Sequence, residues 1–297
     1  MKFKFLQYQD NSTGFRKFAI DKLDTAYNNY KINLIKVKNE FSEENVHDLR
    51  VAIRRFISAI DLFSTFYDNY YFKLIKKNIK LQFNNLAMLR DTQVMLITVI
   101  KMKLKHPFLF DFLQFLLDKE FQQINLNTEF FSAIKADELD DYYYFLNRAL
   151  RIDYQPSSIY FEDVKNVILN KYNELLIQKD SVTFDDPKTI HKLRIKTKKF
   201  RYLIETLAEV INKPKKVLSV LSNIQTTMGN IQDAEVLLNE FTNFAKKNNY
   251  NVVLATLIFD EINYNKQKIV NSLMKEVKIL NDLINFNSDD SENESNI

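Results

Sequence analysis

The chain carries the segment VHDLRVAIRRFISAIDLF at residues 46–63 and a related segment, IHKLRIKTKKFRYLIETL, at residues 190–207. A constant offset of 144 residues places His47 against His191, and the paired positions that follow share a leucine, an arginine and a phenylalanine. Two of the chain's three histidines therefore lead equivalent basic segments. Recurrence within a single sequence indicates an internal duplication.

A second, shorter motif recurs in the same order. LRDTQV at residues 89–94 corresponds to IQDAEV at residues 231–236, at an offset of 142. The difference of two residues between the offsets amounts to one short loop deletion. Because both motifs keep their order, we expect two related halves, about residues 10–152 and about residues 157–286, with a boundary around Pro156.

The composition favours an all-α fold. Gly and Pro number only 2 and 4 in 297 residues, and tight turns and strands depend on them. The abundance of Lys, Asn, Ile, Phe and Tyr is typical of an AT-rich bacterial genome. Hydrophobic periodicity predicts helices at 13–38, 46–67, 71–89 and 91–105, two or three more as far as about 151, and then at 159–179, 188–211, 214–229, 232–247 and 251–285.

Several classes of protein are disfavoured by what the sequence lacks. It has no cysteine, which excludes disulfides and thiolate metal sites. Its first residues, MKFKFLQYQD, contain no apolar core of a signal peptide, and no apolar run approaches the roughly 18 residues of a membrane span. We therefore expect a soluble cytoplasmic protein without a membrane partner.

Positive charge is concentrated away from the C-terminus. The net charge of the chain is +4, but residues 287–297, NSDDSENESNI, contain four acids and no base. This segment predicts a disordered acidic tail, and the remaining residues carry a net charge of +8.

The first motif separates an apolar face from a basic face when it is placed on a helix. At about 100° per residue, the core positions fall on one arc and His47, Arg50 and Arg54 on the other. The second motif repeats the separation with His191, Arg194 and Lys198. The predicted core positions of the first motif are Leu49, Ile53, Phe56, Ile60 and Phe63.

Basic residues also follow the first motif at helical spacing. Lys73, Lys76, Lys77 and Lys80 lie three or four residues apart, whereas the second half has only Lys213, Lys215 and Lys216 at a helix start. We expect a basic surface that is denser in the first half. A charged stripe opposite an apolar one is most often a solvated helix face. Few acids interrupt these stripes, however, and the pattern occurs twice, which favours a polyanion-binding surface.

The chain has too few histidines for the metal and hydrolase sites that its motifs could suggest. Glu44 and His47 have the Glu-x-x-His spacing of di-iron bundles, but Lys188 replaces the glutamate before His191. The His47–Asp48 dipeptide is not duplicated, and one further histidine, His106, remains for a metal site. Since the sequence also lacks a Gly-rich phosphate loop and a credible nucleophile set, we predict no catalytic residues, no metal and no cofactor.

The four motif segments, in their order, resemble those of the CHAD domain, the conserved histidine α-helical domain, over about residues 10–286. The resemblance implies two four-helix-bundle-like halves related by a pseudo-twofold axis, a basic central surface, and binding of inorganic polyphosphate with association to polyphosphate granules. Triphosphatase activity is not implied, because the Glu-x-Glu-x-Lys signature of the CYTH domain, to which many members are fused, does not occur here. The resemblance implies that His47, Arg50, Arg54, Arg55, His191, Arg194, Lys198 and Lys199 bind polyphosphate. To these we add the basic residues Lys73, Lys77, Lys80, Arg90 and Arg201.

Our hypothesis from the sequence is a non-enzymatic protein that binds inorganic polyphosphate along a basic groove between its halves. Gln232 replaces the counterpart of Arg90, so the halves are not expected to contribute equally. The alternatives are a nucleic-acid-binding module and a helical scaffold that is purely structural or docks phosphoproteins. A third is an enzyme acting on polyphosphate, which would need metal-binding carboxylates near the groove. Base stacking would need exposed aromatics, and most aromatic residues of the motifs sit at core spacing. The sequence does not set the oligomeric state.

Overall fold

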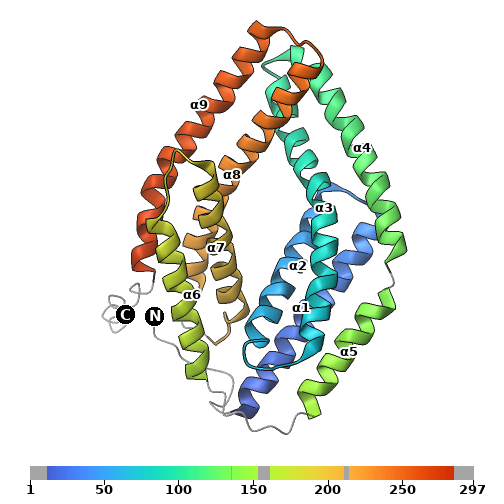
Figure 1. Ribbon diagram of the computed structural model, residues 1–297, viewed down its shortest axis with the longest axis vertical. Helices are drawn as coiled ribbons and strands as arrows, with labels where there is room; N and C mark the ends of the chain where they lie inside the picture. The colour runs from blue at the N-terminus through green and yellow to red at the C-terminus, as the bar shows by residue number, and fades with distance from the viewer. Residues whose placement is uncertain (1–11, 135, 153–160, 211–213, 284–297) are drawn as a thin grey trace, which may run out of the picture. The chain divides into compact units, whose positions relative to one another are not determined.

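The computed structural model describes residues 12–134, 136–152, 161–210 and 214–283. Within these ranges the chain is helical apart from short turns, and no strand occurs in them (Figure 1), so the all-α prediction is confirmed. The predicted acidic tail and the predicted boundary around Pro156 lie outside the described residues.

The helices follow one another through short connections. The first six elements are α1 (Ser12–Asn39), α2 (Glu43–Phe63), α3 (Tyr70–Lys103), the 3-10 turn η1 (Pro107–Leu109), α4 (Phe110–Ala133) and α5 (Ala136–Ile152). They are followed by α6 (Phe161–Asp180), α7 (Pro187–Thr206), α8 (Pro214–Lys247), α9 (Val252–Glu276) and the 3-10 segment η2 (Val277–Asp282).

Two helix breaks expected from the sequence are absent. The breaks near Arg90 and near Gly229 were wrong, because α3 and α8 each run through the shorter motif without interruption. In α3 the buried side chains Leu89, Thr92 and Leu96 keep the helical period across the motif, and no Gly or Pro interrupts the helix. A helix continues where its buried face continues, whatever the polarity of its exposed side.

The contacts divide the chain into two compact units. The larger unit comprises residues 16–155 and 233–262, and the smaller comprises residues 156–232 with both terminal segments, 1–15 and 263–297. Helices α8 and α9 therefore each contribute to both units, whereas the sequence suggested a division into consecutive halves. The duplication itself stays a prediction.

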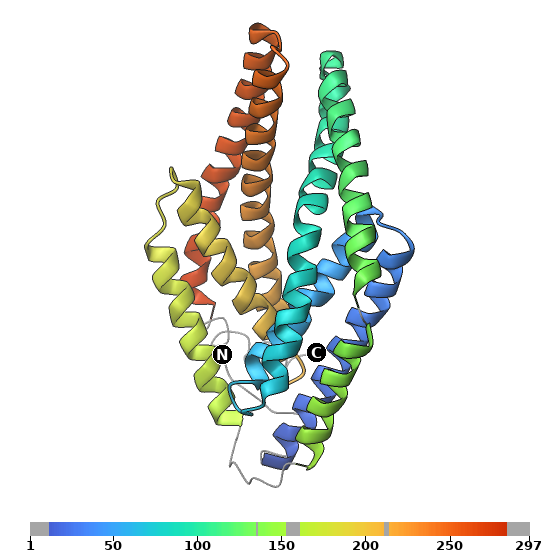
Figure 2. The same ribbon diagram turned by 45° about the vertical axis from the view of Figure 1, so that its right-hand side comes forward.

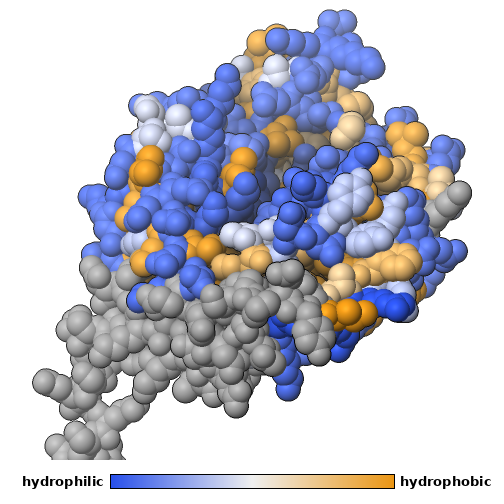
Figure 3. Space-filling model, turned by 60° about the horizontal axis from the view of Figure 1, so that its bottom comes forward, coloured by the Kyte–Doolittle hydropathy of each residue, from blue (hydrophilic) through white to orange (hydrophobic). Residues whose placement is uncertain are grey.

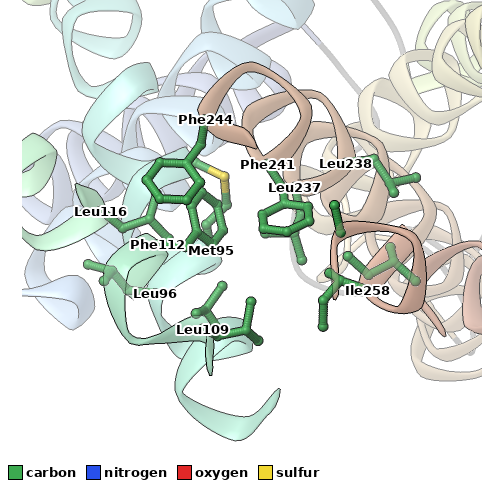
Figure 4. Packing of buried hydrophobic residues seen from close by; sticks show 13 residues of the cluster. Met95, Leu96, Leu109, Phe112, Leu116, Leu237, Leu238, Phe241, Phe244 and Ile258 are labelled. Atoms are coloured by element: carbon green, nitrogen blue, oxygen red, sulfur yellow. The ribbon is translucent and has the colours of Figure 1, made fainter. Parts of the chain in front are cut away.

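In the larger unit, two helical hairpins bury one aromatic cluster between them. The antiparallel pair α3–α4 (Figure 2) supplies Phe112, and the α8–α9 hairpin supplies Phe241 and Phe244 (Figure 4). The ring of Phe112 meets that of Phe241 edge-on, with centroids 5.0 Å apart. Burying these large apolar rings stabilises the packing of the two hairpins against each other.

In the smaller unit, α6 and α7 pack side by side, and α6 is tied to the end of the α9 region. The hydroxyl of Tyr172 donates to the carbonyl oxygen of Leu280 at 2.5 Å, and its ring lies 5.7 Å from that of Phe200 on α7. Thr227 of α8 donates to Glu276 of α9 at 2.7 Å. These contacts join α6 to α7, the second motif helix, and to η2, and they join α8 to α9.

Candidate polyanion-binding surfaces

The first motif helix buries the face that the sequence predicted. Helix α2 begins after Ser42, whose hydroxyl accepts a hydrogen bond from the backbone nitrogen of Asn45. All five predicted core positions are buried, so the assignment of faces is confirmed: Leu49, Ile53, Phe56, Ile60 and Phe63. His47, Arg50 and Arg54 are left on the accessible or half-buried side.

An antiparallel register of side-chain contacts joins α2 to α3 in the larger unit. The three α3 residues that contact α2 are Lys76, Phe83 and Arg90, which are seven residues apart and therefore share one side of that helix. This side faces α2, whereas Lys73, Lys77 and Lys80 lie about 80–140° around the helix from Arg90 and are exposed. The three contacts are Asp61 with Lys76, Arg50 with Phe83, and Glu43 with Arg90.

Phe83 positions two arginines of the first motif. Nη1 of Arg50 donates to the carbonyl oxygen of Phe83 at 2.7 Å, and its guanidinium carbon lies 4.0 Å from the centre of the Phe83 ring. The guanidinium carbon of Arg54 lies 5.9 Å from the same centre. Stacking on an aromatic face restricts the planar guanidinium group, so the two arginines are held side by side. The sequence analysis missed Phe83; its seven-residue spacing from Lys76 and Arg90 is the signal that could have found it.

His47 lies within the field of two of these cations. The pKa of His47 is lowered from its ordinary value because neighbouring atoms partly desolvate the ring, and because Arg90 and Arg54 repel a proton. Asp48 and Glu43 oppose the shift. The ring stays accessible to solvent, so the neutral imidazole is available at the surface as a hydrogen-bonding group.

The second motif helix, α7, is well capped at its start. The side chain of Asp186 accepts from the backbone nitrogen of Lys188 at 2.9 Å, and Pro187 occupies the first turn, where its missing N–H costs nothing. Nδ1 of the exposed His191 lies 2.8 Å from the amide oxygen of Gln232 on α8. Gln232 thus contacts this histidine, whereas Arg90, its counterpart in the first half, acts on His47 through charge.

The remaining predicted residues of α7 differ in exposure. Lys199 is exposed, whereas Arg194, Lys198 and Arg201 are half-buried. Arg201 pairs with Glu205 at 3.0 Å and donates to the hydroxyl of Ser222 on α8 at 3.4 Å. Arg201 is therefore anchored within the smaller unit, so its predicted contact with a ligand would compete with these partners.

The two motif helices differ in the acids that accompany their basic residues. Residues 187–201 of α7 contain seven cations and no acid, whereas α2 carries acids in its first turns. Ion pairs occur in both sets: Lys76 and Arg90 of α3 pair with acids of α2, and Lys196 and Arg201 of α7 pair with Glu174 and Glu205. The basic residues therefore form two separate sets: an Arg50–Arg54–Phe83 group with the exposed lysines of α3, and the acid-free stretch of α7.

Other kinds of site find no support in the part of the chain that the structure describes. No group of three or more His, Asp or Glu residues there could hold a metal ion. None of the described helices combines the length and hydropathy that crossing a bilayer requires. Figure 3 shows one face of the protein, on which hydrophilic residues predominate and hydrophobic residues are dispersed.

Comparison with known proteins identifies the family. The CHAD domain family matches residues 23–241. The crystal structure of the CHAD domain from the plant Ricinus communis superimposes with a TM-score of 0.72 at 15% identity, covering 94% of this chain and 96% of that one. PptA from Streptomyces chartreusis gives a TM-score of 0.69 at 11% identity, covering 89% and 98%. At these identities the two structures establish likeness of fold alone. No curated protein sequence matches the chain.

Proposed function

Because the chain belongs to the CHAD domain family, we propose that it binds inorganic polyphosphate through the basic residues of α2, α3 and α7. The family is linked to polyphosphate binding in general. We also propose that the residues predicted from the sequence form the binding site and that the protein is not an enzyme. Its proposed location is the cytoplasm, in association with polyphosphate granules. So does the hypothesis that one ligand chain engages both motif helices.

The observation that supports the proposal most strongly is the pairing of Arg50 and Arg54 on the ring of Phe83. A polyphosphate chain presents closely spaced anionic groups, and adjacent guanidinium groups can each grip phosphate oxygens through two N–H donors. Restricting the arginines before binding reduces the conformational entropy that the complex must lose. The acid-free basic stretch of α7 supplies further cations of the same kind.

Nucleic acid is the alternative partner, and the basic residues of α2 and α3 provide less of what nucleic-acid binding requires. Base stacking needs an accessible aromatic face beside the basic residues. The aromatic side chain that α3 places beside Arg50, Phe83, is half-buried, and the guanidinium carbon of Arg50 lies 4.0 Å from its ring centre. Polyphosphate has no bases and needs no such platform, so the arrangement favours a ligand made of phosphate alone.

A competition assay tests the proposal. Labelled long-chain polyphosphate is bound at physiological salt and challenged with single-stranded RNA, DNA and short polyphosphate at equal phosphate concentration. We expect long-chain polyphosphate to resist displacement, since a ligand that engages several cations releases more counterions and gains from multivalency. Equal displacement by nucleic acid would refute the preferred ligand.

Charge reversal locates the binding surface. The double variant Arg50→Glu, Arg54→Glu should lose most of its affinity, because two attractive charges become repulsive. The matched control is Lys36→Glu, Lys38→Glu at the exposed C-terminal end of α1, outside the proposed surface, which should bind nearly as well as the parent. Circular dichroism checks that both variants remain helical. Unchanged affinity of the arginine variant would place the site elsewhere.

A further inference from the structure

Two helix-connecting turns of the larger unit lie against each other (Figure 1, top). One joins α3 through η1 to α4, and the other joins α8 to α9. The hydroxyl of Tyr250 in the second turn donates to the carbonyl oxygen of Phe108 in the first at 2.5 Å. Nε2 of His106 lies 2.5 Å from a carboxylate oxygen of Glu261 within α9, so the first turn is joined both to the second turn and to α9. We call residues 101–111 and 246–257 together the hairpin tip.

The backbone of the hairpin tip is well defined by hydrogen bonds. Asn249 adopts a left-handed conformation with φ of 49°, which asparagine tolerates better than most residues, and this conformation closes the end of α8. The side chain of Asn251 then accepts hydrogen bonds from the backbone nitrogens of Val253 and Leu254 at the start of α9. Residues that point outward from this turn are therefore held outward by the fold.

The hairpin tip exposes large apolar side chains. Turns at the surface are usually polar, because their backbone and side chains meet water. Here Leu104 is 87% exposed, and Val252 and Val253, the first residues of α9, are 77% and 69% exposed. Phe110 and Leu257 are also more than half exposed. The buried cluster of Figure 4 lies in the same unit and includes Leu109 of the first turn and Ala255 of α9.

The same residues are accompanied by an excess of lysine. The hairpin tip contains five lysines and one acid, Asp111, and a second acid, Glu261 of α9, lies against its His106. Among the residues that the structure describes, none of the five forms an ion pair, and Nζ of Lys103 lies 4.7 Å from the ring centre of Phe110. The lysines are Lys101, Lys103, Lys105, Lys246 and Lys247.

We propose that the hairpin tip docks the protein onto the surface of an anionic lipid bilayer. Outward apolar side chains enter the boundary between headgroups and acyl chains, and the lysines around them contact anionic headgroups. The long lysine stems allow the ammonium groups to stay at headgroup level while the apolar side chains lie deeper. Docking is peripheral, since no described helix could span the bilayer. It is also independent of polyphosphate binding, and it differs from our expectation from the sequence that no membrane is engaged.

The excess of lysine over acidic residues at the hairpin tip favours a membrane over an apolar protein partner. An interface with a second protein concentrates apolar and aromatic residues at its centre and is depleted in lysine. A membrane-docking surface combines apolar side chains with lysine, because each lysine near an anionic surface strengthens binding. The composition of the hairpin tip matches the second pattern.

Vesicle co-sedimentation tests the proposal with the full chain. We expect binding to vesicles of equal parts phosphatidylcholine and phosphatidylglycerol and at least tenfold weaker binding to phosphatidylcholine alone, since roughly fivefold is contributed by each lysine near the surface. The triple variant Leu104→Ser, Val252→Ser, Val253→Ser should lose binding to the mixed vesicles. The matched control replaces three exposed isoleucines elsewhere, Ile32, Ile35 and Ile177, by serine and should bind as the parent does.

A fluorescence measurement gives a second readout that does not depend on affinity. The chain has no tryptophan, so Phe110→Trp introduces a single reporter at the hairpin tip. Its emission should shift to shorter wavelength on mixed vesicles, because the indole leaves water for the interface. Tyr70→Trp, at the first residue of α3 and 66% exposed, should show no shift.

Three outcomes would overturn the proposal. These are retained vesicle binding by the triple variant, an unchanged emission of the Phe110→Trp protein, and loss of vesicle binding in the Arg50→Glu, Arg54→Glu protein, which would assign the lipid contact to the polyphosphate surface. Sedimentation velocity completes the test: if the triple variant changes the state of association of the free protein and not its lipid binding, the hairpin tip is a protein interface instead.

Discussion

Replacing His47 by glutamine should remove a proton uptake that accompanies polyphosphate binding. In the free protein, desolvation and the charges of Arg90 and Arg54 lower the pKa of His47. Bound phosphate would screen these cations and add negative charge beside the ring, which raises the pKa. A ligand that raises the pKa of a group binds more tightly when that group is protonated. The affinity of the parent protein should therefore increase as the pH falls from about 8 to about 5, the range in which imidazoles titrate.

The size of the effect is limited by the number of groups involved. His47 can take up at most one proton, so its contribution cannot exceed about tenfold in affinity per pH unit. Within the larger unit, His106 is the other histidine, and it is held against Glu261 at the hairpin tip rather than beside the basic residues of α2. The pH dependence assigned to His47 is therefore the difference between the parent and the His47→Gln variant.

Isothermal titration calorimetry provides the assay. Titrations of long-chain polyphosphate in buffers with different ionisation enthalpies yield the number of protons taken up on binding, independently of the affinity. Long chains keep the fraction of titrating end groups small. The His47→Gln variant should take up fewer protons than the parent at the same pH, and its affinity should vary less with pH. His106→Gln is the matched control and should behave as the parent does.

Two results would refute the reasoning. Equal proton uptake by the parent and the His47→Gln variant would mean that His47 does not lie within the field of the bound ligand. An affinity that decreases as the pH falls would mean that the ligand lowers the pKa of His47, and hence that the phosphates do not approach Arg54 and Arg90.

Further outcomes concern binding, stability and salt. Phe83→Leu should weaken polyphosphate binding by about two- to fivefold, the worth of a surface cation–π contact, whereas Phe121→Leu, at an exposed position of α4, should leave it unchanged. Gly229→Ala should stabilise the protein by about 0.5–1 kcal/mol in thermal or chemical unfolding, because the added Cβ would meet Nη2 of Arg194 at an ordinary 3.9 Å and glycine weakens a helix interior. Phe112→Ala should lower the free energy of unfolding by about 3–5 kcal/mol, since it leaves a cavity in the aromatic cluster. Affinity for polyphosphate should fall linearly on a logarithmic plot against salt, and the Arg50→Glu, Arg54→Glu variant should show a shallower slope; equal slopes would separate these arginines from the ligand.

The helical fold and the buried face of the first motif could be predicted from local sequence. The five apolar positions of α2 recur at helical spacing, and a helix that must bury one face has little freedom in choosing which one. The duplicated motifs were sufficient to suggest the CHAD domain family, which the comparison confirms. Helix ends were predicted less well, because a polar pair such as Arg90 and Asp91 resembles a turn unless the buried residues on either side are known.

The sequence by itself determined which residues carry charge and which face of each motif helix can present it. Only the tertiary structure decided how those charges are used. Lys76 and Arg90 are spaced like ligand-binding residues, yet α3 turns them toward acids of α2. Phe83 is placed beneath Arg50 and Arg54 by the antiparallel register of the same two helices. The reason is physical: spacing along a helix reports which side chains share a face, whereas the packing of a second helix determines which of them meet a partner and which meet water.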